Sequence, residues 1–301
     1  MMVWVAYAAM CLIWGTTWLV IKVGLHYLPP VTGSGLRFLI AGLVLFAVAA
    51  ARRELLAPRE VPWKLVGVMG VFMCGVNYAL VYLAETRLDS GLVAVLFATF
   101  PFFMFAFGRV LRIEKTTPLV WAGATVAFAG VAVISVGGQF RASSLYALAV
   151  IAAAASAAFA NCYAKKHAQY GPLATLPLAM TAAGGATSAW GIGTEHVDWA
   201  LAVAPVSLAA LAYLALLGSG LAFFLNLWAL QRLPASVIAL VPLIIPVIAV
   251  SVGIVAGERF GAREALGSAV VVVGISIALA RRLRRREPFQ HTVIAPRAAG
   301  A

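Results

Sequence analysis

Two stretches of the chain share one spacing of glutamate and glycine: EKTTPLVWAGATVAFAG at residues 114–130 and ERFGAREALGSAVVVVG at residues 258–274. In each stretch the glutamate comes first and two glycines follow, seven positions apart, and the second stretch begins 144 residues after the first. Glycines at this interval lie on one face of a helix, where a second helix can approach closely. The shared spacing therefore indicates a duplicated unit that contains a tightly packed helix.

Other positions repeat at nearly the same displacement, which extends the duplication over the whole chain. Arg87 and Leu88 recur as Arg232 and Leu233, and at this displacement of 145 Trp14 and Trp18 correspond to Phe159 and Tyr163. Pro29 and Gly42 recur as Pro172 and Gly185. The agreement to within two residues predicts two copies of one unit, at residues 1–140 and 141–283, followed by a disordered tail at residues 284–301.

The composition indicates a membrane protein. Of the 301 residues, 63% are hydrophobic and 11% are charged, whereas a soluble domain has about 25% charged residues. So few polar groups cannot cover a soluble surface, and apolar segments of about 20 residues span a bilayer as helices. Ten such segments are predicted: residues 3–22, 32–51, 65–84, 91–110, 118–137, 144–164, 173–192, 207–227, 236–256 and 264–281.

The basic residues follow the predicted topology. Fifteen Lys and Arg residues fall on one side of the predicted helices and six, Lys22 and Arg37 among them, fall on the other side. Because Lys and Arg concentrate on the cytoplasmic side of membrane proteins, we expect both termini in the cytoplasm and the chain in the inner (cytoplasmic) membrane. The net charge of +12 then requires no nucleic-acid partner.

Each unit holds five predicted helices, and because five is an odd number the second unit enters the membrane from the opposite side. The predicted fold is therefore all-α and integral to the membrane, with ten transmembrane helices in two inverted five-helix repeats. Inverted repeats are typical of secondary transporters, whose site lies near the bilayer midplane between the two halves. Rocking of the halves then exposes the site to each side in turn.

Several motifs are similar to those of one transporter superfamily. They are W-G-T-T-W-x3-K at residues 14–22, P-P-x5-L-R-F-L-I-A-G at residues 29–42, and G-E-R-F at residues 257–260 followed by L-G-x6-G at residues 266–274. With these motifs the chain, from residue 3 to residue 283, resembles the drug/metabolite transporter superfamily, in the branch built from two EamA domains. The resemblance implies ten helices, an inverted repeat and, often, export of amino acids or other small metabolites. Within the branch the chain is similar to YddG-like aromatic amino-acid exporters.

The first predicted helix places two tryptophans inside the membrane. Trp14 lies roughly 16 Å along the helix, near the midplane of a ~30 Å core, and shares one broad face with Trp18 and Lys22. Either the indoles pack between helices, or they line a cavity and offer apolar surface and cation–π contact to a substrate. Tyr163, equivalent to Trp18, is a further candidate. We expect Lys22 to anchor or gate the outer end of the cavity.

The third and eighth predicted helices carry polar residues. Asn77, Tyr78, Tyr82 and Asn226 are candidate substrate-binding residues, because their polar groups need partners that a water-filled cavity supplies more readily than lipid. For Asn161, bonding between helices is at least as good an explanation. Glu85 lies near a helix end, where we expect a solvated interface position, with gating as the alternative.

Prolines and glutamates mark interruptions of the predicted helices. Pro101, Pro242 and Pro246 fall in the fourth and ninth helices, where each frees a backbone carbonyl and permits a kink. They are candidate gating positions, with simple helix curvature as the alternative. Glu114 and Glu258 precede helix N-termini, and we interpret them as capping residues. No carboxylate is predicted at mid-span, so no residue is singled out for proton or sodium coupling.

The sequence lacks the motifs of an enzyme or of an ATP-driven pump. The four histidines are scattered over loops and the tail, and neither metal-ligand spacing nor a Walker motif is present. We therefore predict no catalytic residue, metal or cofactor. The expected partners are the lipid bilayer and a small-molecule substrate, and the expected assembly is a monomer or weak homodimer. The predicted function is alternating-access export of a small metabolite, and the favoured substrate is an amino acid with an aromatic or other apolar side chain. The alternatives are a transporter of a non-amino-acid metabolite or drug and a passive channel.

Overall fold

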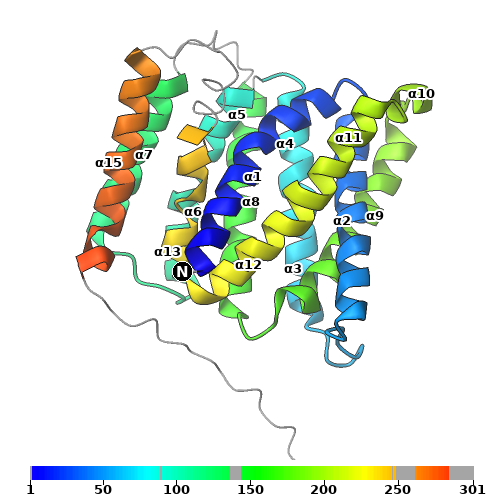
Figure 1. The fold of residues 1–301 in the computed structure, drawn as a ribbon, viewed down its shortest axis with the longest axis horizontal. Coiled ribbons are helices and arrows are strands. Elements are labelled where there is room, and N and C mark those ends of the chain that lie inside the picture. Colours follow the sequence, from blue (N-terminus) through cyan, green and yellow to red (C-terminus); the bar gives the residue numbers. More distant parts are fainter. Residues whose placement is uncertain (1, 89, 136–143, 246, 249–261, 285–301) are drawn as a thin grey trace, which may run out of the picture.

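The computed structural model describes residues 2–88, 90–135, 144–245, 247–248 and 262–284, and every regular element in these ranges is a helix (Figure 1). The helices lie side by side as one bundle. The N-terminus and the last described turn of α15 both lie at the lower part of this view. Residues 285–301, for which a disordered tail is predicted, lie outside the described residues.

The first half of the chain contains α1 (Met2–Gly24), α2 (Pro30–Ala51), α3 (Trp63–Val68), η1 (Met69–Val76), α4 (Asn77–Glu85), α5 (Ser90–Phe97), α6 (Phe100–Val110) and α7 (Pro118–Ser135). The second half contains α8 (Ser144–Lys166), α9 (Pro172–Thr194), α10 (Trp199–Ala202), α11 (Pro205–Tyr213), η2 (Leu214–Leu221), α12 (Ala222–Arg232), α13 (Ala235–Ile238) and α15 (Ala262–Arg284).

Six described helices are long and apolar enough to cross a membrane, which confirms an all-helical membrane fold. They are Met2–Gly24, Pro30–Ala51, Trp63–Glu85, Leu92–Val110, Leu145–Lys166 and Pro205–Arg232. Three further apolar helices are shorter: Pro118–Val133, Ala235–Ile245 and Leu266–Leu279. Helix α9 has 23 residues and coincides with the seventh predicted span. The ninth predicted span continues to residue 256, beyond the described residues.

The third and eighth predicted spans contain the same rare backbone feature. The segments η1 and η2 are π-helical, have eight residues each, and begin at Met69 and Leu214, 145 positions apart. Each joins the α-helices before and after it into one long helix. Because π-helices are uncommon and short, their occurrence at equivalent positions shows that the two halves share a backbone conformation as well as a sequence pattern.

Helices α2 and α9 pack closely through glycines. A Cβ atom on Gly35 would overlap the backbone of Ser188, one on Gly42 would overlap Thr181, and one on Gly184 would overlap Leu39. Residue numbers rise along α2 as they fall along α9, so the two helices run antiparallel. Contact of this kind between small residues lets two backbones approach where lipid provides no hydrophobic driving force.

Helices α7 and α15, which carry the repeated glycine spacing, also pack against each other. A Cβ atom on Gly123 would lie 2.5 Å from the backbone nitrogen of Ala278, and one on Gly130 would lie 2.7 Å from the nitrogen of Val271. Gly274 meets Ala127 in the same way. The prediction of close helix packing at these glycines is therefore confirmed by the contacts, and the partner of each helix is its counterpart in the other half.

The fourth predicted span is broken, not merely kinked. Helix α5 ends at Phe97, residues 98–99 form a turn, and α6 begins at Phe100 with Pro101 in its first turn. Proline suits this position because the first turn of a helix needs no donor from its backbone nitrogen. The ninth span has a turn at residues 239–240 before Pro242. Pro246 lies outside the described residues.

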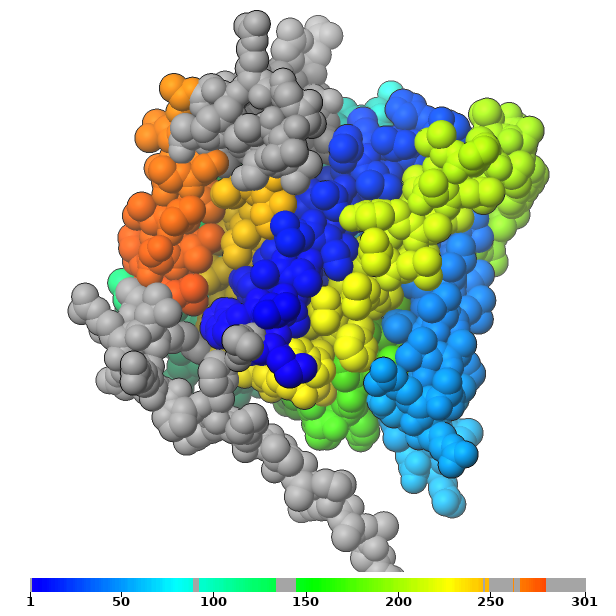
Figure 2. All heavy atoms as spheres, in the orientation of Figure 1, coloured from blue at the N-terminus to red at the C-terminus, as the bar shows by residue number. Residues whose placement is uncertain are grey.

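Helix α1 is packed into the bundle through residues of the second half of the chain. Figure 2 shows its residues in blue across the face of the molecule, beside the yellow residues of α12. The Tyr7 hydroxyl donates a hydrogen bond to the carbonyl oxygen of Val237, with the two oxygens 3.1 Å apart. These contacts place Trp14 and Trp18 between the two halves.

Candidate functional site

A cavity lies between the helices of the two halves, and its empty volume is about 670 Å³, part of which is open at its mouth. Each half contributes three segments. The first half contributes α1, the helix formed by η1 and α4, and the broken fourth span. The second half contributes the equivalent segments, which are α8, α12 and the ninth span. The residues that line it are Trp14, Thr17, Trp18, Ile21, Met73, Asn77, Tyr78, Val81, Phe97, Phe100, Ala157, Asn161, Phe223, Asn226, Ile238, Val241, Pro242 and Ile245.

Aromatic rings form one wall of this cavity. The rings of Trp14 and Phe223 meet edge to face with centroids 5.4 Å apart, and the ring of Phe223 is also 5.9 Å from that of Tyr78. Trp18 meets Phe97 edge to face at 5.6 Å. Edge-to-face contacts of this kind stabilise the ring positions by about 0.5–1.5 kcal/mol each. The wall therefore presents a fixed apolar surface.

The two tryptophans differ in their hydrogen bonds. The indole Nε1 of Trp14 donates to the carbonyl oxygen of Gly218 in η2 at 3.2 Å. No hydrogen bond of the Trp18 indole is present within the described part of the chain. Trp14 is thus tied to the π-helix of the opposite half, whereas Trp18 is held by ring packing alone.

Three asparagines supply polar groups to the cavity. Asn226 Nδ2 donates to Asn161 Oδ1 at 2.8 Å, and Asn161 Nδ2 donates to the carbonyl oxygen of Ala157 at 2.9 Å. Asn77 Nδ2 donates to the carbonyl oxygen of Met73 at 3.2 Å, but its Oδ1 is buried and has no partner. A buried acceptor without a donor is costly, so Asn77 Oδ1 is a point at which a bound molecule would gain a hydrogen bond.

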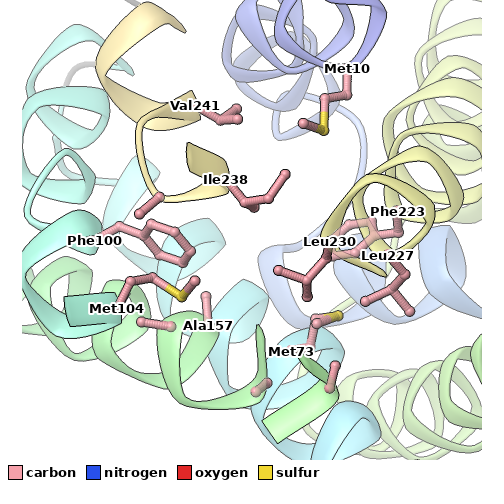
Figure 3. Packing of buried hydrophobic residues seen from close by; sticks show 14 of the residues in the cluster. Met10, Met73, Phe100, Met104, Ala157, Phe223, Leu227, Leu230, Ile238 and Val241 are labelled. Carbon is pink, nitrogen blue, oxygen red and sulfur yellow. The ribbon is translucent and has the colours of Figure 1, made fainter. Parts of the chain in front are cut away.

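Large apolar side chains pack at the opposite end of the cavity from Lys22. Figure 3 shows Leu227 and Leu230 of α12 together with Met10 of α1, Met104 of α6 and Ile238 of α13. Each of them belongs to the main buried cluster, and Met104 and Leu230 are 1% exposed. This packed layer separates the cavity from the end of the bundle at which α8 and α12 terminate.

The structure brings together some of the predicted site residues and leaves others apart. Trp14, Trp18, Asn77, Tyr78 and Asn226 line the cavity, together with Pro242. Tyr82 is buried one helical turn beyond Tyr78, against Ile21 and Leu214. Tyr163 packs on His167, with ring centroids 4.4 Å apart, and on Phe159.

The helix geometry explains why Tyr163 does not line the cavity. Asn161, on the same helix, faces it, and a residue two positions later points about 200° away around the axis. Asn161, Phe97, Phe100 and Phe223 also line the cavity and are not among the binding residues that the sequence predicts. The signal for Asn161 was an amide in an apolar helix, whereas the phenylalanines offered no signal that separates lining from packing.

Arg37 is inside the bundle and not at a helix end, which corrects its assignment to one side of the membrane. Its side chain is fully buried, Nη2 donates to the carbonyl oxygen of Gly218 at 3.0 Å, and Nε donates to Ser219 Oγ. Its guanidinium carbon lies 4.5 Å from the ring centroid of Tyr78. Arg37 therefore supports a ring of the cavity wall and the same η2 carbonyl that binds Trp14.

Glu85 is also buried, so the prediction of a solvated interface position is wrong. Its exposed fraction is 0%, and neither carboxylate oxygen has a hydrogen-bond partner. The ammonium group of Lys22 donates instead to the backbone oxygens of Glu85 and Leu88, at 2.8 and 3.1 Å. The sequence does not reveal this burial because it arises from contacts with side chains of other helices, such as Lys22 of α1, which reaches the end of α4.

Glutamates cap helices of the opposite half. Glu114 accepts hydrogen bonds from the backbone nitrogen of Ser236 at 3.0 Å and from its hydroxyl at 2.6 Å, at the start of α13. Glu195 accepts from the backbone nitrogens of Val31 and Thr32, at 2.9 and 2.7 Å, at the start of α2. Capping was predicted for Glu114, but on the helix that follows it. Glu258 lies outside the described residues.

The described residues contain no group of three or more His, Cys, Asp or Glu side chains that could hold a metal ion. The cavity itself is lined by apolar, aromatic, hydroxyl and amide side chains, and none of the described residues that line it is charged. Such a lining binds a small molecule through ring surface and a few hydrogen bonds.

Comparison with known proteins gives a family and a fold. Residues 1–136 and 144–280 each match the EamA-like transporter family. The chain is 30% identical to the "Uncharacterized inner membrane transporter YedA" of Escherichia coli strain K12, over 89% of this chain and 87% of that protein. It is 28% identical to a "Probable amino-acid metabolite efflux pump" of Salmonella typhimurium, over 88% and 90%. A solved crystal structure superposes with a TM-score of 0.79 at 22% identity, covering 93% of this chain and 98% of that one.

Proposed function

The chain belongs to the EamA-like transporter family, a family of membrane transporters and not of enzymes, and on this premise we propose that it transports an amino acid with an aromatic or other apolar side chain. The observation that carries the proposal is the uncharged cavity of rings and amides between the two halves. An amino acid is a zwitterion without net charge, so it needs polar contacts at one end and apolar surface at the other.

The lining offers a partner for each part of such a substrate. The rings of Trp18 and Phe97 supply apolar surface, and the face of an indole attracts an ammonium group. Asn77 Oδ1, which lacks a donor, suits the same ammonium. The amide nitrogens of Asn161 and Asn226 are donors for a carboxylate, because each amide has two N–H groups and uses one in the bonds described.

We propose that ten helices form two inverted five-helix repeats, at residues 1–140 and 141–283, that work by alternating access. The antiparallel packing of α2 on α9, the paired π-helices and the two broken spans support this arrangement. Broken helices at a central site are typical of inverted-repeat transporters. Pro101 and Pro242, next to the breaks, are proposed gating residues, as is Pro246; Lys22 and Glu85 gate the end at which α1 terminates.

The proposed setting is the inner membrane, with both termini in the cytoplasm and transport outward, by a monomer or weak homodimer. The excess of Lys and Arg on one side supports the orientation. The names of two relatives, an inner membrane transporter and a probable efflux pump, support the proposed membrane and the proposed direction of transport.

The test is uptake of radiolabelled phenylalanine, tryptophan, threonine and methionine into vesicles that contain the purified protein. We expect saturable uptake of at least one amino acid, faster when the vesicles are preloaded with the unlabelled compound, because only a carrier shows such counterflow. Trp18→Ala should abolish uptake, whereas Trp190→Ala, at a position 68% exposed on α9, should not.

Three results would contradict the proposal. Uptake of none of the four amino acids would point to another class of metabolite or drug. Uptake that is neither saturable nor accelerated by preloading would indicate a channel. Equal uptake by the Trp18→Ala variant and the native protein would show that Trp18 packs between helices and does not bind the substrate.

A further inference from the structure

Glu85 occupies an enclosed polar site just beyond the cavity. It is the last residue of α4, one turn past Val81, which lines the cavity, and thus about 6 Å farther along the helix. Its side chain is fully buried and its two carboxylate oxygens accept no hydrogen bond. Among the acidic side chains that the structure describes, it is the only one that is buried.

The cations nearest to Glu85 are engaged elsewhere. Lys22 on α1 and Arg37 on α2 are the cations that lie near it. Lys22 Nζ donates to two backbone oxygens, and Arg37 donates to Gly218 and Ser219. Arg37 Nη1 is buried without a partner and makes no hydrogen bond to the Glu85 carboxylate. Among the described residues of the two buried clusters at this place, the other titratable side chains are phenols: Tyr78 and Tyr82 on α4, Tyr146 on α8 and Tyr213 on α11.

An ionised carboxylate in such a site would be left without any donor. Burying a charge that is neither paired nor hydrogen-bonded costs far more than burying a neutral carboxyl group, whereas a protonated carboxyl is compatible with the arrangement. The Tyr82 hydroxyl is likewise buried without a partner and lies on the same helix. In the observed conformation the geometry therefore suits a Glu85 side chain that carries a proton.

We propose that Glu85 binds and releases a proton during the transport cycle, which couples transport to a proton gradient. The proposal rests on the proposed function. When the end of the bundle near Lys22 opens, water reaches the carboxyl group, the O–H bond breaks, and the proton passes to water. Lys22 then leaves the two backbone oxygens and pairs with the carboxylate. When this end has closed and the opposite end opens, the carboxylate takes up a proton from water on that other side and Lys22 returns to the two backbone oxygens, so one proton crosses the membrane in each cycle.

The first experiment uses infrared spectroscopy of the purified full-length protein in vesicles of ether-linked lipids, which have no ester C=O band, and needs no substrate. A protonated carboxyl group has a C=O stretching band that an ionised carboxylate lacks. We expect this band in the native protein at neutral pH, its loss in Glu85→Gln, and its retention in Glu54→Gln, where an exposed glutamate is changed. Absence of the band from the native protein at neutral pH, or its persistence in Glu85→Gln, would overturn the proposal.

The native spectrum decides the matter even if Glu85→Gln does not fold. Raising the pH in native vesicles should remove the band, and it should return when the pH is lowered. A band that stays over the whole pH range in which the protein remains folded shows a carboxyl group that never releases its proton, which contradicts a coupling role.

The second experiment measures uptake of the amino acid found above under an imposed pH gradient. We expect the native protein and Glu54→Gln to accumulate it with one polarity of the gradient, and uptake by Glu85→Gln to be the same with either polarity. Accumulation by Glu85→Gln equal to that of the native protein, or no response of the native protein to the gradient, would contradict coupling. If the protein transports none of the amino acids, the infrared result still shows whether Glu85 binds and releases a proton. The proposal of amino-acid transport and the proposal for Glu85 can therefore be refuted independently.

Discussion

Lys22 and Lys165 make the same contact at opposite ends of the bundle. Lys165 Nζ donates to the backbone oxygens of Leu230 and Leu233, at 2.6 and 3.0 Å, as Lys22 Nζ does to those of Glu85 and Leu88. The lysines are 143 positions apart, and their acceptors are 145 positions apart. Each lysine joins the first span of its half to the C-terminal end of the third span of that half, Trp63–Glu85 or Pro205–Arg232. At these ends, unpaired carbonyl groups and the helix dipole favour a cation.

We expect Lys22→Met and Lys165→Met each to slow transport. Each substitution leaves two carbonyl oxygens without a charged donor, and such bonds contribute roughly 1.5–3 kcal/mol. If these contacts hold the closed form of each end, their loss will change the transport rate more than the apparent affinity for substrate. Initial rates over a range of substrate concentrations measure both. Lys64→Met, at an exposed position, is the control, and equal rates in all three variants would dismiss the lysines as gates.

Neighbouring glycines on α9 provide a sharp test of the packing against α2. Gly184→Ala should destabilise the protein by about 1–3 kcal/mol, since a Cβ there overlaps the backbone of Phe38 and Leu39. Gly185→Ala meets nothing within 4 Å and should be neutral, or stabilising by up to about 1 kcal/mol through helix propensity. Thermal unfolding in one detergent compares them, and equal melting temperatures would show that α2 and α9 do not pack as described.

The buried arginine should matter for transport more than its distance from the cavity suggests. Arg37→Met removes the donors to Gly218 and Ser219 and the cation beneath the Tyr78 ring. Charged hydrogen bonds of roughly 1.5–3 kcal/mol correspond to a ten- to hundredfold weakening of substrate binding if the wall depends on them. Equilibrium binding of the labelled substrate measures the effect. Arg87→Met, at an exposed arginine, should bind as the native protein does, and native affinity in Arg37→Met would refute the supporting role.

Asn161 and Asn226 should act as a pair. Because the amide nitrogen of one donates to the oxygen of the other, we expect Asn161→Ala and Asn226→Ala to be non-additive, with a coupling energy of about 0.5–3 kcal/mol. Substrate affinities of the native protein, both single variants and the double variant provide the cycle. Strict additivity would show that the two amides contact substrate, or the protein, independently.

The fold was predictable to the extent that repetition and hydropathy specify it. The spacing of Glu114, Gly123 and Gly130 and its copy indicated the duplication, and the predicted resemblance to proteins with two EamA domains is confirmed. The breaks before Pro101 and Pro242 were foreseen only as kinks, because a proline shows where a donor is missing but not whether the chain turns. The π-helices had no signal in the sequence.

The site was less predictable, because lining a cavity depends on which helices surround a residue. The shared helical face correctly groups Trp14 and Trp18, whereas the repeat offers Tyr163 as the equivalent of Trp18, and Tyr163 faces away from the cavity. The burial of Arg37 and Glu85 arises from contacts between helices distant in sequence, so distance from a helix end misjudged both. Their charge in an apolar segment was the available warning, since ionisable groups in a membrane span are costly and typically functional.

The π-helical segments have a mechanical consequence. A π-helical turn can move along a helix by exchanging one backbone hydrogen bond at a time. Each residue that it passes rotates about the helix axis by ~100°, the rotation between successive residues of an α-helix. Segment η1 ends immediately before Asn77 and Tyr78, and η2 ends immediately before the turn that carries Phe223. A shift of either π-helical turn by one position would rotate these side chains relative to the cavity, while the ends of the same helices that Lys22 and Lys165 bind stay in place.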